Sequence, residues 1–522
     1  MGSSSRRRLI GLSRSWRVSS VAVVAFIGLL SGGSGPLAVA ARSQVPVGAP
    51  PVTGVNASPE PAGSEPTAAS AGAVVGAATT VPAVNVAAPV GGALPPATSP
   101  TSAVRPNPNA DVTSTSSTSS LTSSSSSTAV GRLTKSTTTK PAAVTVDDLR
   151  LRIAALMDNS TAASIGALVV IDGGPTIFAH NADSAMIPAS TQKMYIAGAA
   201  LAALGVDARF TTDVLASGAM DGSTLRGDLV VRASGDPSFT STDLNALAAS
   251  VRATGLTSVT GRLVIDDTRF DRQARVATWK AKFSPGEAGW LSAFSVDGNH
   301  RSDTETVADA SLANLSRFRD ALRAKGVTIV GAEQRGVAGP SATPIAAQRS
   351  AALQDLVRTF MKKSDNTYAE LITKELGARQ GVGSTAAGVQ AIASYFSALN
   401  VVPPSVQEDG SGLSLNNRSS ARVQVRYLQK ALASPTGSAL RSSLAVSCVD
   451  GTLKSRTCGT AAAGKVFAKT GSIDYVVALT GVTTTGSGKP VTFSFLLNSV
   501  RSPRLARSAI DAALQEIVGS QL

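Results

Sequence analysis

A long tract of small and polar residues limits where this chain of 522 residues can fold. Residues 41–143 consist almost entirely of Ala, Pro, Ser, Thr, Val and Gly, and the stretch 114–128 is nearly all Ser and Thr. Because such a tract has very few large apolar side chains, it cannot bury enough surface to offset the conformational entropy lost on folding. We therefore expect a disordered linker at 41–143 and folded domains from about Thr145 onward.

The first 40 residues have the organisation of a signal peptide. Five arginines precede an apolar run at 18–30, and Ala38-Val39-Ala40 offers a small-residue cleavage site. The run of 13 residues is too short to cross a bilayer, which takes about 20 residues. We predict export to the cell envelope, meaning a periplasm-like space or the cell wall, and an uncleaved N-terminal membrane anchor is the alternative.

Charge and composition restrict the partners and the chemistry. The net charge of +14 suits an anionic cell-wall or membrane surface, although solubility explains it equally well. No basic patch is interleaved with aromatic residues, so nucleic acid is not expected. His180 and His300 are the only histidines, which argues against a Ser-His-Asp triad and against a zinc peptidase. We expect no metal and no cofactor, and the sequence does not indicate an oligomeric state.

The only two cysteines, Cys448 and Cys458, are close in the sequence. In an oxidising compartment they would close a short loop as a disulfide, and two buried thiols are the alternative.

Hydrophobic periodicity after Thr145 predicts both helices and strands. Strands are expected at 167–171, 176–179, 210–216, 229–232, 263–266, 466–468, 475–482 and 491–498. Helices are expected from Thr145, at 194–204, 242–254, 353–361, 368–376 and 384–399, and from Ser502 near the C-terminus. Residues 270–345 show no clear pattern. These elements predict an antiparallel sheet flanked by the first and last helices, with a helical subdomain between.

A serine and a lysine at the start of one predicted helix form the first candidate for chemistry. Ser190 and Lys193 follow Pro188 and are three residues apart, so they share a helical face. A serine hydroxyl needs an adjacent base to become a nucleophile. Lys193 can be that base only when it is partly neutral, which requires burial or a nearby cation. Taken alone, this pattern also arises by chance in long chains.

Two further motifs follow in order. Ser364-Asp365-Asn366 comes as a strongly amphipathic helix ends, and Lys469-Thr470-Gly471 lies between predicted strands. S-x-x-K, S-D-N and K-T-G together are the signature of penicillin-binding proteins and class A β-lactamases.

From Thr145 to its end, the chain resembles the type-4, class C low-molecular-mass penicillin-binding proteins of the DacB type, which are D-alanyl-D-alanine carboxypeptidases and endopeptidases. The match extends to Ser-Gly-Asp-Pro-Ser at 234–238, Asp-Gly-Ser-Gly-Leu-Ser at 409–414 and Asp-Gly-Thr-Leu at 450–453. The implied fold is an α+β transpeptidase-like domain of the penicillin-binding and β-lactamase type, with an inserted α/β domain.

The resemblance implies a catalytic role for five residues. Ser190 would be acylated, and Lys193 would take its proton. Ser364 would relay a proton to the leaving amine, and Asn366 would orient Lys193 and the substrate amide. Lys469 would bind the terminal carboxylate of the substrate. Its positive charge is also expected to lower the pKa of Lys193.

Further residues are implied in substrate binding. Thr470 would contact the carboxylate, Gly471 would keep the strand edge open, and the N–H groups of Ser190 and Ser472 would form the oxyanion hole. The resemblance links Asp236 to recognition of a charged side chain of the stem peptide, and a turn-forming Asp-Pro is the alternative.

The spacing of the motifs predicts the domain organisation. Ser190 and Ser364 are 174 residues apart, more than in a compact class A β-lactamase. We therefore expect a transpeptidase-like domain at 144–206 and 346–522, and one inserted domain at 207–345. The family's usual Arg after Gly-Leu-Ser is replaced by Leu415, with Arg418 as a nearby substitute.

The predicted function is that of an exported serine-type D-Ala-D-Ala carboxypeptidase. It would act on peptidoglycan stem peptides through an acyl-enzyme on Ser190, with endopeptidase activity on crosslinks as a second activity, and β-lactams would inhibit it. The alternatives are a β-lactamase on the same scaffold and a non-catalytic wall-binding protein.

Overall fold

The computed structural model describes residues 144–300 and 309–522. The predicted signal peptide and linker therefore lie outside the described residues. Within those ranges, every helix is too short or too polar to span a membrane. The first element is α1 (Val146–Asp158), which begins where the sequence predicts. Thr145 and Asp148 close a reciprocal capping box at its start, and this satisfies backbone N–H groups that would otherwise lack partners.

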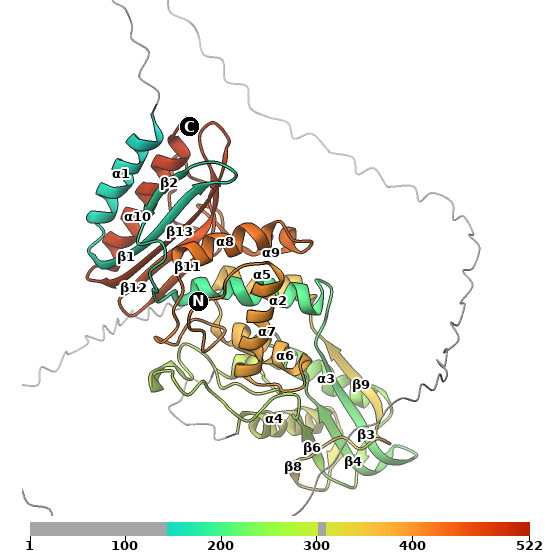
Figure 1. The fold of residues 1–522 in the computed structure, drawn as a ribbon. Helices are drawn as coiled ribbons and strands as arrows, with labels where there is room; N and C mark the ends of the chain where they lie inside the picture. The colour runs from blue at the N-terminus through green and yellow to red at the C-terminus, as the bar shows by residue number, and fades with distance from the viewer. Residues whose placement is uncertain (1–143, 301–308) are drawn as a thin grey trace, which may run out of the picture. The chain divides into compact units, whose positions relative to one another are not determined.

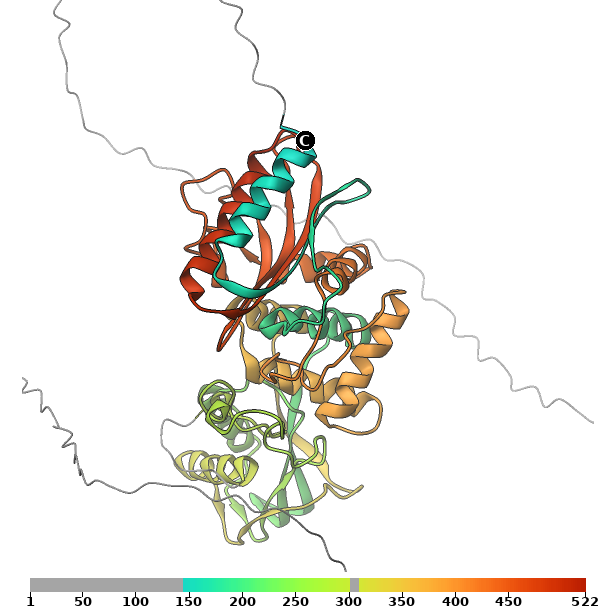
Figure 2. The ribbon, with the colours of Figure 1, turned by 60° about the vertical axis from the view of Figure 1, so that its left-hand side comes forward.

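A six-stranded antiparallel sheet joins the two ends of the described chain. Its order is β10-β11-β12-β13-β1-β2. The strands are β1 (Ala162–Ile171), β2 (Thr176–His180), β10 (Ala445–Val446), β11 (Phe467–Ile473), β12 (Val476–Thr484) and β13 (Pro490–Val500). Helices α1 and α10 (Pro503–Gly519) lie side by side along this sheet, as Figure 1 and Figure 2 show. Apolar residues of both helices and of the sheet form one core cluster, which is the predicted arrangement.

A group of helices contributes a second core. Helix α8 packs on β13 and β1, and α2, α5, α6 and α7 pack on one another. Their bounds are α2 (Lys193–Leu204), α5 (Leu353–Lys363), α6 (Asn366–Arg379), α7 (Thr385–Ala398), α8 (Ala421–Leu432) and α9 (Gly437–Ser443). Tyr195, Phe396 and Tyr427 are packed ring against ring at its centre. This core holds α2 and α6, which carry two of the three motifs.

A mixed second sheet is built from residues between the first two motifs. Its order is β7-β5-β4-β3-β9, and β6 pairs with both β4 and β8. The strands are β3 (Thr211–Asp221), β4 (Thr224–Arg232), β5 (Ser258–Val259), β6 (Leu263–Asp266), β7 (Thr328–Ile329), β8 (Glu333–Arg335) and β9 (Thr343–Arg349), with helices α3 (Ser241–Ala253) and α4 (Ala310–Ala324). β3 is antiparallel to β4 and β9, whereas β4 runs parallel to β5 and β6.

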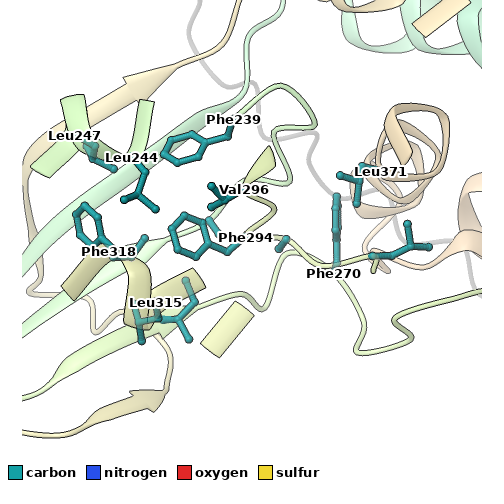
Figure 3. Packing of buried hydrophobic residues seen from close by; sticks show 14 of the residues in the cluster. Phe239, Leu244, Leu247, Phe270, Phe294, Val296, Leu315, Phe318 and Leu371 are labelled. Carbon is teal, nitrogen blue, oxygen red and sulfur yellow. The ribbon is translucent and has the colours of Figure 1, made fainter. Parts of the chain in front are cut away.

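The core of this inserted part is aromatic and leucine-rich. Figure 3 shows Phe294 between Phe239 and the α4 residues Leu315 and Phe318. All four side chains are at most 2% exposed. Burial of a side chain of this kind contributes about 1.5–3 kcal/mol, and the cluster continues beyond the insertion to Leu371 and Leu413.

Several elements differ from the sequence prediction. The segment 270–345 contains α4 and three short strands, although no element was predicted there. Two of these strands, β7 and β8, are only two or three residues long, and β9 has no buried residue, so they leave little periodic signal. Helix α4 did have a usable pattern, because Leu315, Phe318 and Leu322 share its buried face. The expected domain boundary between 345 and 346 falls inside β9, which pairs with β3 of the inserted sheet.

Candidate active site

The nucleophile candidate lies in a tight turn before α2. Ser190 belongs to the 3-10 helix η1 (Ala189–Gln192), and Lys193 is the first residue of α2. The two residues therefore share a face, and the Lys193 Nζ atom donates a hydrogen bond of 3.0 Å to the Ser190 Oγ atom. This is the contact that the three-residue spacing predicts.

Lys193 is completely buried. Its Nζ atom also donates to the Asn366 Oδ1 atom and to the carbonyl oxygen of Ser411, each at 2.6 Å. Burial lowers the pKa of Lys193 to about 8, and the acids Asp409 and Glu370 oppose this shift. Of the two causes expected from the sequence, burial and a nearby cation, burial is the dominant one. Near neutral pH a fraction of this amine is therefore unprotonated and able to accept a proton.

The second motif connects two helices. Helix α5 ends at Ser364, which adopts a left-handed backbone with φ of 61°. Asp365 caps α6 by accepting a hydrogen bond of 3.0 Å from the Tyr368 N–H. Asn366 then begins α6 and uses both ends of its amide: Oδ1 accepts from Lys193, and Nδ2 donates to the Glu287 carbonyl oxygen at 2.7 Å. Asn366 thereby couples the inserted part to the lysine.

The third motif lies on β11. The Lys469 Nζ atom donates to the Ser364 Oγ atom and to the Thr470 carbonyl oxygen, both at 2.8 Å. Burial, with a smaller contribution from the charge of Lys193, holds the pKa of Lys469 well below its usual range.

The glycine of that motif allows two backbones to approach each other. A Cβ atom at Gly471 would lie 2.8 Å from the Pro188 carbonyl oxygen. Such a contact is too short for any side chain, so only glycine lets β11 lie against η1. The residue after it, Ser472, borders the same cleft as Ser190.

The three motifs surround a polar cleft of about 490 Å³. Ser190, Ser364, Asn366, Thr470 and Ser472 line it, and the buried Lys193 and Lys469 contact the first two of these from behind. The inserted part contributes Lys282, Phe283 and Glu287 to the wall of the cleft. The remaining lining residues are Gly412, Leu413, Thr452, and Ile473 and Asp474 at the end of β11. Five of the predicted site residues therefore line one cavity.

Two predicted contacts lie elsewhere. Asp236 does not line the cleft; its buried carboxylate accepts hydrogen bonds from the N–H and the hydroxyl of Ser238, as in a turn-forming Asp-Pro. Burial raises the pKa of Asp236 to about 6. Arg418 donates to the carbonyl oxygens of Leu415 and Asn417 and does not line the cleft either.

Several residues of the site were not predicted. The Thr470 hydroxyl donates to the Thr452 hydroxyl at 2.8 Å, and Glu370, Asp409 and Ser411 surround Lys193. Asp409, Ser411 and Thr452 belong to strings noted in the sequence without an assigned role. Glu370 follows Asn366 by one helical turn, which places it on the same face of α6, and this spacing was the one available signal.

The two cysteines form a disulfide across a separation of 10 residues. The disulfide closes the loop that precedes β11, and neither cysteine lines the cleft. Within the described residues, no group of three or more His, Cys, Asp or Glu side chains is arranged to hold a metal ion.

Comparison with known proteins agrees with the motifs and with the geometry of the cleft. The model of the D-Ala-D-Ala carboxypeptidase 3 (S13) family matches residues 149–285 and 290–517. A D-alanyl-D-alanine carboxypeptidase from Actinomadura sp. (strain R39) is 29% identical over 456 residues, covering 70% of this chain and 84% of that protein. Carboxypeptidase DacB of Mycolicibacterium smegmatis is 30% identical over 382 residues, covering 69% and 81%.

A solved structure is similar in fold. Penicillin binding protein 4 (dacB) from Haemophilus influenzae superposes with a TM-score of 0.61 at 22% identity, covering 71% of this chain and 97% of that one. This likeness confirms the predicted fold class. The family match spans all three motifs, and the chain belongs to the D-Ala-D-Ala carboxypeptidase 3 (S13) family.

Proposed function

We propose that this protein is a serine-type D-Ala-D-Ala carboxypeptidase that acts on peptidoglycan stem peptides through an acyl-enzyme on Ser190. The observation that carries the proposal is the buried Lys193 amine, whose pKa is lowered to about 8 and which lies 3.0 Å from the Ser190 hydroxyl. A base with a pKa near the working pH and within hydrogen-bond reach of the nucleophile is the arrangement that general-base catalysis requires.

The reaction begins with acylation. Neutral Lys193 accepts the hydroxyl proton while the Ser190 Oγ atom attacks the carbonyl carbon of the penultimate D-Ala. The N–H groups of Ser190 and Ser472 stabilise the oxyanion, an effect worth about 2.7–4 kcal/mol for a single donor in another serine peptidase. The C–N bond then breaks, and the proton that Lys193 accepted is relayed through the Ser364 hydroxyl to the leaving D-Ala amine, which leaves Lys193 neutral again; Ser364 is hydrogen-bonded to Lys469.

Lys469 and Lys193 have separate roles in substrate binding and in deacylation. Lys469 and Thr470 bind the terminal carboxylate, and a bound carboxylate would restore the protonated state of the buried Lys469. Water next attacks the ester while Lys193 accepts its proton, and Lys193 returns this proton to the Ser190 oxygen as the ester C–O bond breaks. Endopeptidase cleavage of a crosslink would follow the same steps with a different leaving amine.

We place this reaction in the cell envelope. The family activity is directed at D-Ala-D-Ala termini, which belong to peptidoglycan, and a disulfide is typical of an oxidising compartment. The apolar run and cleavage site near the N-terminus agree with export. Any contact with the membrane surface would rest on the positive charge of the chain.

Fluorescent penicillin and a D-Ala-D-Ala pentapeptide test the proposal together. A long-lived adduct on the wild-type chain, absent in Ser190→Ala, and release of D-alanine from the pentapeptide are the expected results. Adduct formation in Ser190→Ala would refute the assignment of Ser190 as the nucleophile. Rapid penicillin turnover selects the β-lactamase, and wall binding without D-alanine release selects the non-catalytic alternative.

A further inference from the structure

A buried acid lies one helical turn beyond Asn366 and is not used in the mechanism above. Glu370 on α6 is completely buried, and its Oε1 atom accepts hydrogen bonds from the N–H groups of Gly410 (3.0 Å) and Ser411 (2.6 Å). The Oε2 atom has no hydrogen-bond partner among the described residues. Burying a carboxyl group with an unpaired oxygen lowers the free energy of unfolding. A role that is only structural does not account for a carboxyl group at this position.

The peptide unit held by Glu370 leads directly to the base. Ser411 receives the bond from Glu370 at its N–H, and its own carbonyl oxygen accepts from the Lys193 Nζ atom at 2.6 Å. Asp409 fixes the same loop by accepting from the N–H groups of Gly412 and Ser414. The loop is therefore anchored by two acids, and the bonds from Glu370 are the ones next to the carbonyl that contacts Lys193.

The geometry of a neutral amine explains why this carbonyl matters. An unprotonated Lys has two N–H bonds and one lone pair. The Asn366 Oδ1 atom and the Ser411 carbonyl oxygen are both acceptors, and together they take the two N–H bonds. The lone pair is then directed at the third neighbour, the Ser190 Oγ atom, from which it must remove a proton.

We propose that Glu370 is a positioning residue for acylation: by holding the Ser411 peptide unit, it keeps the carbonyl oxygen of Ser411 on Lys193 and the lone pair of the amine on Ser190. This inference rests on the proposed function and deepens it.

The charge of Glu370 is compatible with this role. Burial and the neighbouring Asp409 raise the pKa of Glu370 to about 8. The Oε1 atom accepts from both N–H groups in either protonation state, and a raised pKa reduces the negative charge that would favour the protonated, inactive form of Lys193.

Two variants of nearly equal size distinguish the effect of the hydrogen bonds of Glu370 from the effect of the volume of its side chain. Glu370→Gln keeps an acceptor oxygen for the Gly410 and Ser411 N–H groups, whereas Glu370→Met fills the same space without one. The measurement is acylation of the full chain by fluorescent penicillin, resolved into the dissociation constant of the non-covalent complex and the first-order acylation rate constant.

The matched control is Glu375→Met. Glu375 is also buried on α6, but its carboxylate pairs with Arg269 and Arg379, whereas that of Glu370 holds the loop that contacts Lys193. We expect Glu370→Met to lower the acylation rate constant about 10- to 100-fold with little change in the dissociation constant, because small misplacements of catalytic groups have effects of this size. Glu370→Gln should restore most of the rate, and Glu375→Met should lose stability but not rate.

Acylation of Glu370→Met at the wild-type rate would overturn the inference, and so would an equal loss in Glu375→Met. If thermal denaturation shows that Glu370→Met does not fold, Glu370→Asp replaces it. This variant draws the carboxyl group back by one methylene, and a wild-type rate constant there also overturns the inference. A wild-type chain that penicillin does not acylate refutes the proposed function itself, and the role of Glu370 with it.

Discussion

Lys469 on β11 donates a hydrogen bond of 2.8 Å to the hydroxyl of Ser364 at the end of α5, across 105 residues of sequence. This contact joins the sheet to the helices at the cleft. It also brings a second buried lysine close to Lys193, and burial of both amines lowers both pKa values. Lys193 can therefore serve as the base, and Lys469 can bind the carboxylate of the substrate.

Replacing Lys193 by Arg should abolish most acylation. Arginine keeps the positive charge and the N–H donors but does not lose its proton in proteins, so it cannot act as the base. The expected loss is about 10²–10⁴-fold in the second-order rate constant for penicillin, measured by stopped-flow or gel fluorescence. Wild-type acylation of Lys193→Arg would assign the base to another group.

Acylation should depend on pH with a midpoint near the lowered pKa of Lys193, which is about 8. The neutral amine is the active form, and falling pH protonates it, so the rate should fall roughly tenfold for each pH unit below the midpoint. Rising pH should bring the rate to a plateau. The measurement is the acylation rate from pH 6 to 9 with a neutral β-lactam ester as a control for the carboxylate. A flat profile over this range would contradict the assignment.

Replacing Thr470 by Val should weaken recognition of the carboxylate. The two side chains have the same shape, and the variant lacks only the hydroxyl. Hydrogen bonds to charged groups are worth about 1.5–3 kcal/mol, so kcat/KM for a D-Ala-D-Ala peptide should fall about 10- to 100-fold. Thr452→Val, which removes the hydroxyl that Thr470 contacts, should have a smaller effect. An equal loss on a peptide with an amidated C-terminus would argue against a carboxylate contact.

Removing the disulfide should lower stability without removing activity. In the chain-entropy view, a loop as short as the one between Cys448 and Cys458 contributes about 2–3 kcal/mol to the free energy of unfolding. Replacing both cysteines by Ala should therefore lower the midpoint of urea unfolding, and reducing agent should then have no further effect. Because neither cysteine lines the cleft, acylation at low urea should stay near the wild-type level.

Local patterns predicted much of the fold. The apolar stripe of α5 is fully buried as expected, at Leu353, Leu356, Val357, Phe360 and Met361. Such a stripe depends on side-chain spacing within one helix, so neighbours in the sequence determine it. The strands of two or three residues in the inserted sheet had no comparable signal, because only pairing with distant strands makes them strands.

The identity and order of the three motifs were likewise readable, and with them the meeting of Ser190 and Lys193, which one turn of backbone imposes. Tertiary structure decided the rest of the site. It buried Lys193 and so lowered its pKa, it placed Asp236 in a turn outside the cleft, and it brought the carbonyl oxygen of Ser411 to the lysine across 218 residues. Burial and long-range contact arise from packing of the whole domain, and no local spacing encodes them.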